Sequence, residues 1–144
     1  LEFNRRPDLP ELNRRKEGAV RRAFELVRKG IESGDLRIVA EGATLSALAN
    51  QPILPKPGLE ELLDWAYARG SPGICAAHSG SVVGVFFGDL KRLDLNVVRE
   101  EIARVLPGVR VLGGYKLRGG GVECARVPRW ELERGPREIR SSYG

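Results

Sequence analysis

Residues 73–87, GICAAHSGSVVGVFF, mark the point where the sequence changes from helical to strand-like patterning. Two short runs, 73–77 and 81–87, are built from small, β-branched and aromatic residues, which is the composition of buried strands. Between them lies a loop of small residues that contains the chain's single histidine, His78. The stretch therefore predicts two strands joined by a loop, which is either a tight hairpin or a backbone site that holds a ligand.

Three helices are predicted before this stretch. Apolar residues recur at three- and four-residue spacing from Lys16 to Gly34, which predicts an amphipathic helix with the inner face Ala19, Val20, Ala23, Phe24, Val27 and Ile31. Asp35 follows as the N-cap of a second helix. Three prolines make residues 50–58 a loop, and a third helix is predicted over residues 59–69. Pro7 and Pro10 predict an extended lead-in over residues 1–12.

The elements after the stretch decide the fold class. Asp94 can cap a fourth helix with the inner residues Leu95, Val98, Ile102 and Val105, and two further strands are predicted over 109–115 and 122–127. Helices and strands that do not alternate strictly indicate an α+β fold. We expect a ferredoxin-like plait with a mostly antiparallel four-stranded sheet and helices on one face. The chain divides into a lead-in or junction segment (1–15), one domain (16–128) and a basic surface tail (129–144).

Composition limits the class of protein. The 144 residues are enough for one domain with a hydrophobic core, and 42% apolar with 30% charged residues is ordinary for a soluble globular protein. The net charge of +5 comes mostly from arginine, which suits either a phosphate-containing partner or a merely solvated surface. No apolar run is long enough to span a membrane, so we expect no membrane partner.

The cysteines and the missing methionine carry two further expectations. Cys75 and Cys124 lie in apolar segments without metal-ligand spacing, which predicts reduced, buried, structural cysteines and a cytoplasmic protein. The chain begins with Leu1 and contains no methionine, so we expect it to be part of a longer protein.

Little in the sequence predicts side-chain catalysis. One histidine and two separated cysteines make no metal set, so no metal ligand is assigned. Cys75 and His78 are three residues apart and would point to opposite faces of a continued strand, while Ser79 and Ser81 beside His78 lack a third member. No catalytic residue is identified. The small residues at 76–81 do let a ligand approach the backbone, and consecutive N–H groups there could converge on an anion. A small-residue hairpin packed against a neighbouring element explains the same residues equally well.

Three features occur together and carry a resemblance: the helical segment ending in ATLSALANQPILPKP, the helix after it, and the loop in GICAAHSGSVVGVFF. This combination resembles the C-terminal domain of the GHMP kinases, a superfamily of small-molecule kinases. The form AHSGS is more similar to the members that phosphorylate L-threonine in cobalamin side-chain synthesis. In the superfamily a glycine-rich third motif follows a strand of this domain. Ala77, His78, Ser79, Gly80 and Ser81 map onto that motif, with His78 where many members have glycine.

The resemblance implies that the whole protein transfers the γ-phosphoryl group of ATP, with Mg²⁺, to a hydroxyl of a small-molecule substrate, L-threonine on the narrower similarity. The main ATP-phosphate loop of such kinases lies in an N-terminal domain, and nothing like it occurs in this chain. We therefore expect a missing N-terminal kinase domain as partner, and little activity from this chain alone. Residues 77–81 would border the active-site cleft. Asn50 and Gln51 lie in the matching segment without an assigned role, and helix capping and loop hydrogen bonds explain them sufficiently.

Two alternatives from other classes stay open. A basic α+β module could bind RNA by stacking bases on sheet aromatics, although Phe86 and Phe87 lie in an apolar run and no aromatic–basic interleaving marks an open face, which argues against a nucleic-acid partner. A small-molecule or amino-acid sensing domain would have the same fold and bind its ligand without turnover.

Overall fold

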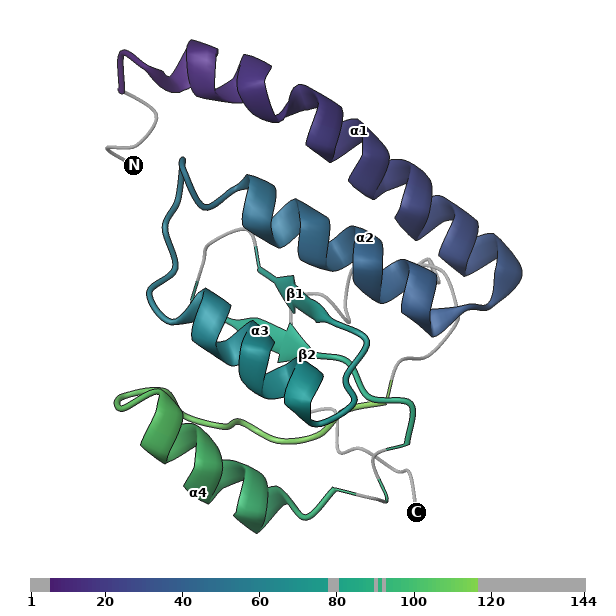
Figure 1. Cartoon of the computed structure of the whole chain (residues 1–144), viewed down its shortest axis with the longest axis vertical. Coiled ribbons are helices and arrows are strands. Elements are labelled where there is room, and N and C mark those ends of the chain that lie inside the picture. Colours follow the sequence, from purple (N-terminus) through teal and green to yellow (C-terminus); the bar gives the residue numbers. More distant parts are fainter. Residues whose placement is uncertain (1–5, 78–80, 90, 92, 117–144) are drawn as a thin grey trace, which may run out of the picture. The chain divides into compact units, whose positions relative to one another are not determined.

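The residues that the structure describes form four helices and one pair of antiparallel strands (Figure 1). The computed structural model describes residues 6–77, 81–89, 91 and 93–116. The elements follow the order α1 (Leu9–Ser33), α2 (Leu36–Ala49), α3 (Leu59–Ala68), β1 (Ile74–Ala76), β2 (Val83–Val85) and α4 (Leu95–Val105). The described residues up to Gly114 belong to one unit, and all contacts below lie within it. No helix among the described residues is long and apolar enough to cross a membrane.

Helix α1 begins earlier than expected. Asp8 stands at its N-cap, and Pro10 lies in the first turn, where proline costs nothing because the backbone N–H of that turn has no partner inside the helix. The extended lead-in predicted over residues 1–12 is therefore wrong for residues 9–12. The end of the helix is as predicted: Gly34 takes the left-handed conformation with φ 68°, and the Asp35 side chain caps α2 by accepting a hydrogen bond from the Arg37 N–H.

Helices α1 and α2 lie side by side at very close range (Figure 1). A Cβ at Gly42 of α2 would lie 2.7 Å from the carbonyl oxygen of Ala23, and a Cβ at Gly30 would lie 2.6 Å from the Val39 nitrogen. These glycines place the contact line along Ala23 and Gly30 of α1, both buried. Phe24 and Ile31, expected on the inner face, are consequently 68% and 69% exposed.

The two strands form the hairpin that the opening stretch predicts, but they are shorter than expected. Ile74 pairs with Val85, Cys75 with Gly84 and Ala76 with Val83. A Cβ at position 84 would lie 2.8 Å from the Cys75 sulfur, so a larger residue there would displace the Cys75 side chain. Cys75 is a free thiol, as predicted, but it is half-buried rather than buried.

The core consists of two neighbouring clusters. The first joins α2, α3 and β1 through Ala47, Leu59, Leu63, Ala66 and Ile74. The second joins α3 to α4 through Leu62, Val98, Ile102 and Leu106, with Val83 and Val85 of the hairpin packed against it. Helix α3 buries the apolar residues Leu59, Leu62, Leu63 and Ala66. Val105 of α4, expected on the inner face, is 43% exposed. Val83 and Val85 pack against both core clusters, so helices of both clusters hold the hairpin in place.

The α+β class is confirmed, but a four-stranded sheet is not shown: the described residues form a two-stranded sheet. The strand predicted over 109–115 is absent, since residues 109–116 have no regular structure; Val111 packs against the second core cluster without joining a strand ladder. The strand predicted over 122–127 and the tail over 129–144 lie outside the described residues. The ferredoxin-like plait therefore stays a prediction.

Candidate functional site

The loop between β1 and β2 is described only at its two ends. The Ala77 N–H donates to the Val82 carbonyl over 2.9 Å, which extends the strand pairing by one residue. Ala77 and Ser81 are exposed. His78, Ser79 and Gly80 lie outside the described residues. A hairpin is thus shown, and the prediction that residues 77–81 bind a ligand stays a prediction.

A cavity of about 360 Å³ lies beside the Ala77 end of this loop. It is bounded by α1, α2, the loop after α2, and β1, with the lining residues Lys16, Val20, Val27, Ala43, Ser46, Ala47, Asn50, Lys56, Cys75, Ala76 and Ala77. Its volume is in the range of small-molecule sites. Two of its polar groups are ammonium groups, Lys16 and Lys56, so we call it the Lys16–Lys56 pocket. It brings Asn50 and Ala77, both noted from the sequence, into one wall.

Lys16 reaches the pocket from α1. Its Nζ donates a hydrogen bond of 3.0 Å to the Asn50 side-chain oxygen, across 34 positions of the chain. Asn50 is the C-cap of α2, where its N–H donates to the Ala47 carbonyl and the N–H of Gln51 donates to the Leu48 carbonyl. The side chain of Asn50 is therefore free of capping duty and fixes the position of the Lys16 ammonium. Because α1 and α2 are antiparallel, this contact closes one end of the helix pair.

Lys56 comes from the proline-rich loop and is 6% exposed. Gln51 holds its backbone at both ends: the Lys56 N–H donates to the Gln51 side-chain oxygen over 2.8 Å, and the Gln51 amide donates to the Lys56 carbonyl over 3.3 Å. The Lys56 ammonium donates one long hydrogen bond, 3.4 Å, to the Leu54 carbonyl. Gln51 thus makes the loop hydrogen bonds considered for it above, and they fix a buried lysine.

Sequence reasoning missed both lysines. Lys16 was placed at the start of a helix and Lys56 in a loop, and both positions are normally solvated. A signal for Lys56 existed in the pattern Pro55-Lys56-Pro57, which fixes the backbone on both sides of the lysine.

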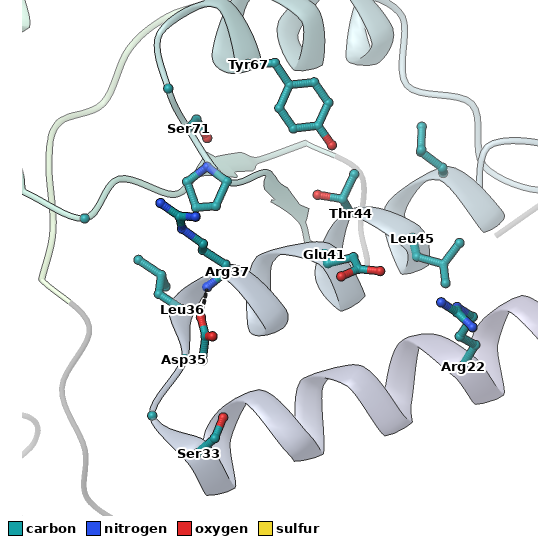
Figure 2. A pocket seen from close by; sticks show the side chains of 15 residues that line it. Arg22, Ser33, Asp35, Leu36, Arg37, Glu41, Thr44, Leu45, Tyr67 and Ser71 are labelled. Carbon is teal, nitrogen blue, oxygen red and sulfur yellow. Dashed lines mark hydrogen bonds between the residues drawn. The ribbon is translucent and has the colours of Figure 1, made fainter.

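A larger groove of about 1140 Å³ lies at the opposite end of the hairpin, beside Pro72 and Gly88 (Figure 2). It carries charges of both signs, with Arg22 and Arg37 facing the same space as Asp35 and Glu41. Ala77 and Ser81, the described residues of the 77–81 loop, do not line it. Neither cavity contains a metal set: the described residues include no group of three histidine, cysteine or carboxylate side chains close enough to share an ion.

Comparison with known proteins shows the family to which the chain belongs. Residues 24–108 match the family model "GHMP kinases C terminal". This segment contains the hairpin, the 77–81 loop and most of the Lys16–Lys56 pocket. The chain therefore belongs to the GHMP kinase family, of which it carries the C-terminal domain, and the resemblance inferred from the sequence is confirmed.

Individual relatives narrow the similarity. The chain is 37% identical over 107 residues to the L-threonine kinase of Salmonella typhimurium (strain LT2), covering 68% of this chain and 35% of that protein. It is 40% identical over 81 residues to the L-threonine kinase of Citrobacter freundii, covering 56% of this chain and 28% of that protein. The chain thus spans about a third of the length of these relatives. No solved structure matches it.

Proposed function

We propose that the chain is the C-terminal portion of a kinase that transfers the γ-phosphoryl group of ATP to the hydroxyl of L-threonine. The observation that carries the proposal is the similarity to two L-threonine kinases, within a family-model match that includes the 77–81 loop. Phosphoryl transfer depends mainly on positioning and charge stabilisation, and a small-residue loop fixed by a hairpin suits that task. Mg²⁺ and ATP, a role in cobalamin side-chain synthesis and a cytoplasmic location belong to the same proposal.

An N-terminal domain is part of the proposal, because the chain spans about a third of its relatives. That domain would supply the main ATP-phosphate loop, and residues 77–81 would face it. We also propose that the C-terminal domain covers residues 16–128. Helix α1 begins at Leu9, before the first residue of this proposed domain. Alone, the chain would show little activity.

The test uses a protein that includes the upstream coding region. Incubation with ATP, Mg²⁺ and L-threonine should yield O-phospho-L-threonine, detected as a new ³¹P resonance and by mass. L-Serine and L-threonine with a blocked hydroxyl serve as acceptor controls. Phosphoryl transfer to another small alcohol, and not to L-threonine, would show that the protein is a kinase with a different acceptor. If no acceptor is phosphorylated and ATP does not bind, the proposal is overturned.

The sensing alternative remains as a second candidate, because the Lys16–Lys56 pocket could hold an amino-acid carboxylate without any transfer. The same incubation distinguishes a sensor from a kinase: a sensor would bind L-threonine without consuming ATP. The RNA-binding alternative gains no support from the described residues, where Phe87 packs edge-on against Trp65 with ring centroids 6.5 Å apart instead of forming a stacking face.

A further inference from the structure

We propose that the Lys16–Lys56 pocket is a binding site for a small oxyanion group, a carboxylate or a phosphate, held by the two ammonium groups together with the Asn50 amide. The site is distinct from the 77–81 loop that the family resemblance assigns, and it borders that loop at Ala77. It rests on the geometry of the pocket and does not require that the chain belong to an active kinase.

The first argument is the burial of Lys56. A lysine is almost never fully buried without a paired charge, because removing an ammonium from water is costly. Lys56 is 6% exposed, and its three N–H donors are served by one carbonyl at 3.4 Å. Among the described residues, neither Lys56 nor Lys16 forms an ion pair with a carboxylate. A bound anion would supply the missing countercharge.

The second argument is preorganisation. Gln51 clamps the Lys56 backbone from both sides, and Pro55 and Pro57 restrict the chain before and after it. Asn50 fixes the Lys16 ammonium at 3.0 Å. Two lysines that line one cavity are thus held in place by contacts already made before a ligand binds, which lowers the ordering cost of binding. A solvated surface lysine has no such support.

The third argument is the space between them. Small side chains, Ala43, Ala47, Ala76 and Ala77, form much of the rest of the wall, and Ser46 adds a hydroxyl. A volume of about 360 Å³ accommodates an amino acid or a phosphate group with its first waters. The shared chemistry is a compact oxyanion with one or two negative charges, which accepts charge-assisted hydrogen bonds from ammonium donors. An acceptor carboxylate and a nucleotide phosphate both fit this description.

The test is NMR of the lysine ammonium groups of the 144-residue chain, titrated at constant ionic strength with inorganic phosphate, L-threonine or L-threoninamide. Binding should shift the Lys16 and Lys56 resonances and leave the exposed Lys29 unchanged. Shifts with L-threonine but not with L-threoninamide identify a carboxylate site; shifts with phosphate alone identify a phosphate site. No saturable shift of either lysine with phosphate or L-threonine overturns the proposal.

Variants give a second readout by isothermal titration. Lys56→Gln and Lys16→Gln should each weaken anion binding by about tenfold or more, because each removes a charge-assisted hydrogen bond. Lys29→Gln removes the same charge from an exposed part of α1 and should change affinity by less than about twofold. Equal losses in all three variants would mean a general charge effect and would overturn the site. If Lys56→Gln does not fold, Lys16→Gln and the wild-type titration still decide.

The outcome separates this site from the kinase proposal. If the longer protein binds the anion but transfers no phosphoryl group, the anion site is supported and the kinase proposal is overturned. Phosphoryl transfer by the longer protein, with no saturable anion binding at Lys16 or Lys56, supports the kinase proposal and overturns the anion site.

Discussion

The hydroxyl of Thr44 in α2 makes two hydrogen bonds to the backbone of Ile74 in β1. It accepts from the Ile74 N–H over 2.9 Å and donates to the Ile74 carbonyl over 3.2 Å. Both residues are buried. At this position the hydroxyl does what a neighbouring strand would do, and it ties α2 to the strand that leads into the 77–81 loop. These two bonds therefore join α2, which is followed by Asn50, directly to β1, which is followed by Ala77.

Replacing Thr44 by valine keeps the shape and removes both hydrogen bonds. Because an unsatisfied buried backbone group costs about 1–3 kcal/mol, we expect Thr44→Val to lower the free energy of unfolding by about 2–4 kcal/mol. Thr44→Ser keeps the hydroxyl and is the matched control, with a loss of about 1 kcal/mol for the deleted methyl group. Urea unfolding measures both; a valine variant as stable as the serine variant would contradict this role.

The close approach of α1 and α2 predicts opposite effects for two glycine-to-alanine changes in helices. Gly42→Ala puts a Cβ 2.7 Å from the Ala23 carbonyl oxygen, so the helices must separate, and we expect a loss of about 1–3 kcal/mol. Gly18→Ala meets nothing within 4 Å and should stabilise the chain by about 0.5–1 kcal/mol through helix propensity. Thermal unfolding gives the two signs, and a stabilised Gly42→Ala variant would show that the helices are not packed this tightly.

Glu101 of α4 connects α3 to α4 through two side chains. It accepts a hydrogen bond of 3.2 Å from the Trp65 indole N–H and pairs with Arg69, whose guanidinium lies 5.9 Å from the Trp65 ring centroid. We expect Glu101→Ala to destabilise the chain by about 1–2 kcal/mol, because it leaves a half-buried donor without its acceptor.

The control for that change is Glu100→Ala on the next position of α4. Glu100 is exposed and pairs with Arg104 at 3.6 Å, so its loss should change stability by no more than about 0.5 kcal/mol. Chemical unfolding of both variants makes the comparison, and similar values for the two would mean that the Trp65 contact adds nothing.

Asp8 and Arg6 predict a pH effect at the start of α1. The Arg6 side-chain hydrogen bond lowers the pKa of Asp8 below its ordinary value of 3.8. A lowered folded-state pKa means that the ionised carboxylate is favoured by folding. The contribution of the pair is therefore present above pH 3.8 and is lost as the pH falls through the lower folded-state value.

NMR titration of the Asp8 carboxyl carbon measures this shift. Arg6→Gln should return the Asp8 pKa toward its ordinary value, since it removes the main cause of the shift. Arg6 also donates to the Pro52 and Ile53 carbonyls over 3.2 Å, so the same variant should loosen the loop that carries Lys56. An unchanged Asp8 pKa in Arg6→Gln would exclude the pair as the cause.

The sequence predicted most of the helices, because their apolar periodicity and caps are local signals. Asp35 and Asp94 cap α2 and α4 as expected, and Gly34 ends α1. Pro10 predicts an extended segment, but proline is also favoured in the first turn of a helix, and the structure has it there. Which apolar residues of α1 are covered could not be predicted, since Gly42 on another helix decides it.

The extent of the strands and the composition of the pocket could not be predicted from local sequence patterns. Residues 73–87 predict the hairpin, but the length of its strands depends on partners distant in the sequence. Residues 109–115 pair with no strand among the described residues. Ala77 and Asn50 were singled out from the sequence, whereas Lys16 and Lys56 were not. Their importance comes from burial and from contacts such as Lys16 to Asn50, 34 positions apart, which no local pattern encodes.

Cys75 gives the pocket a chemical reporter of its own. It is a free, half-buried thiol that lines the Lys16–Lys56 pocket from β1. Because Cys75 lines this space, we expect an occupied pocket to slow the alkylation of its thiol by iodoacetamide. Peptide mapping distinguishes this cysteine from Cys124. Ligands can therefore be screened against the native, unlabelled chain by the rate at which one thiol is lost.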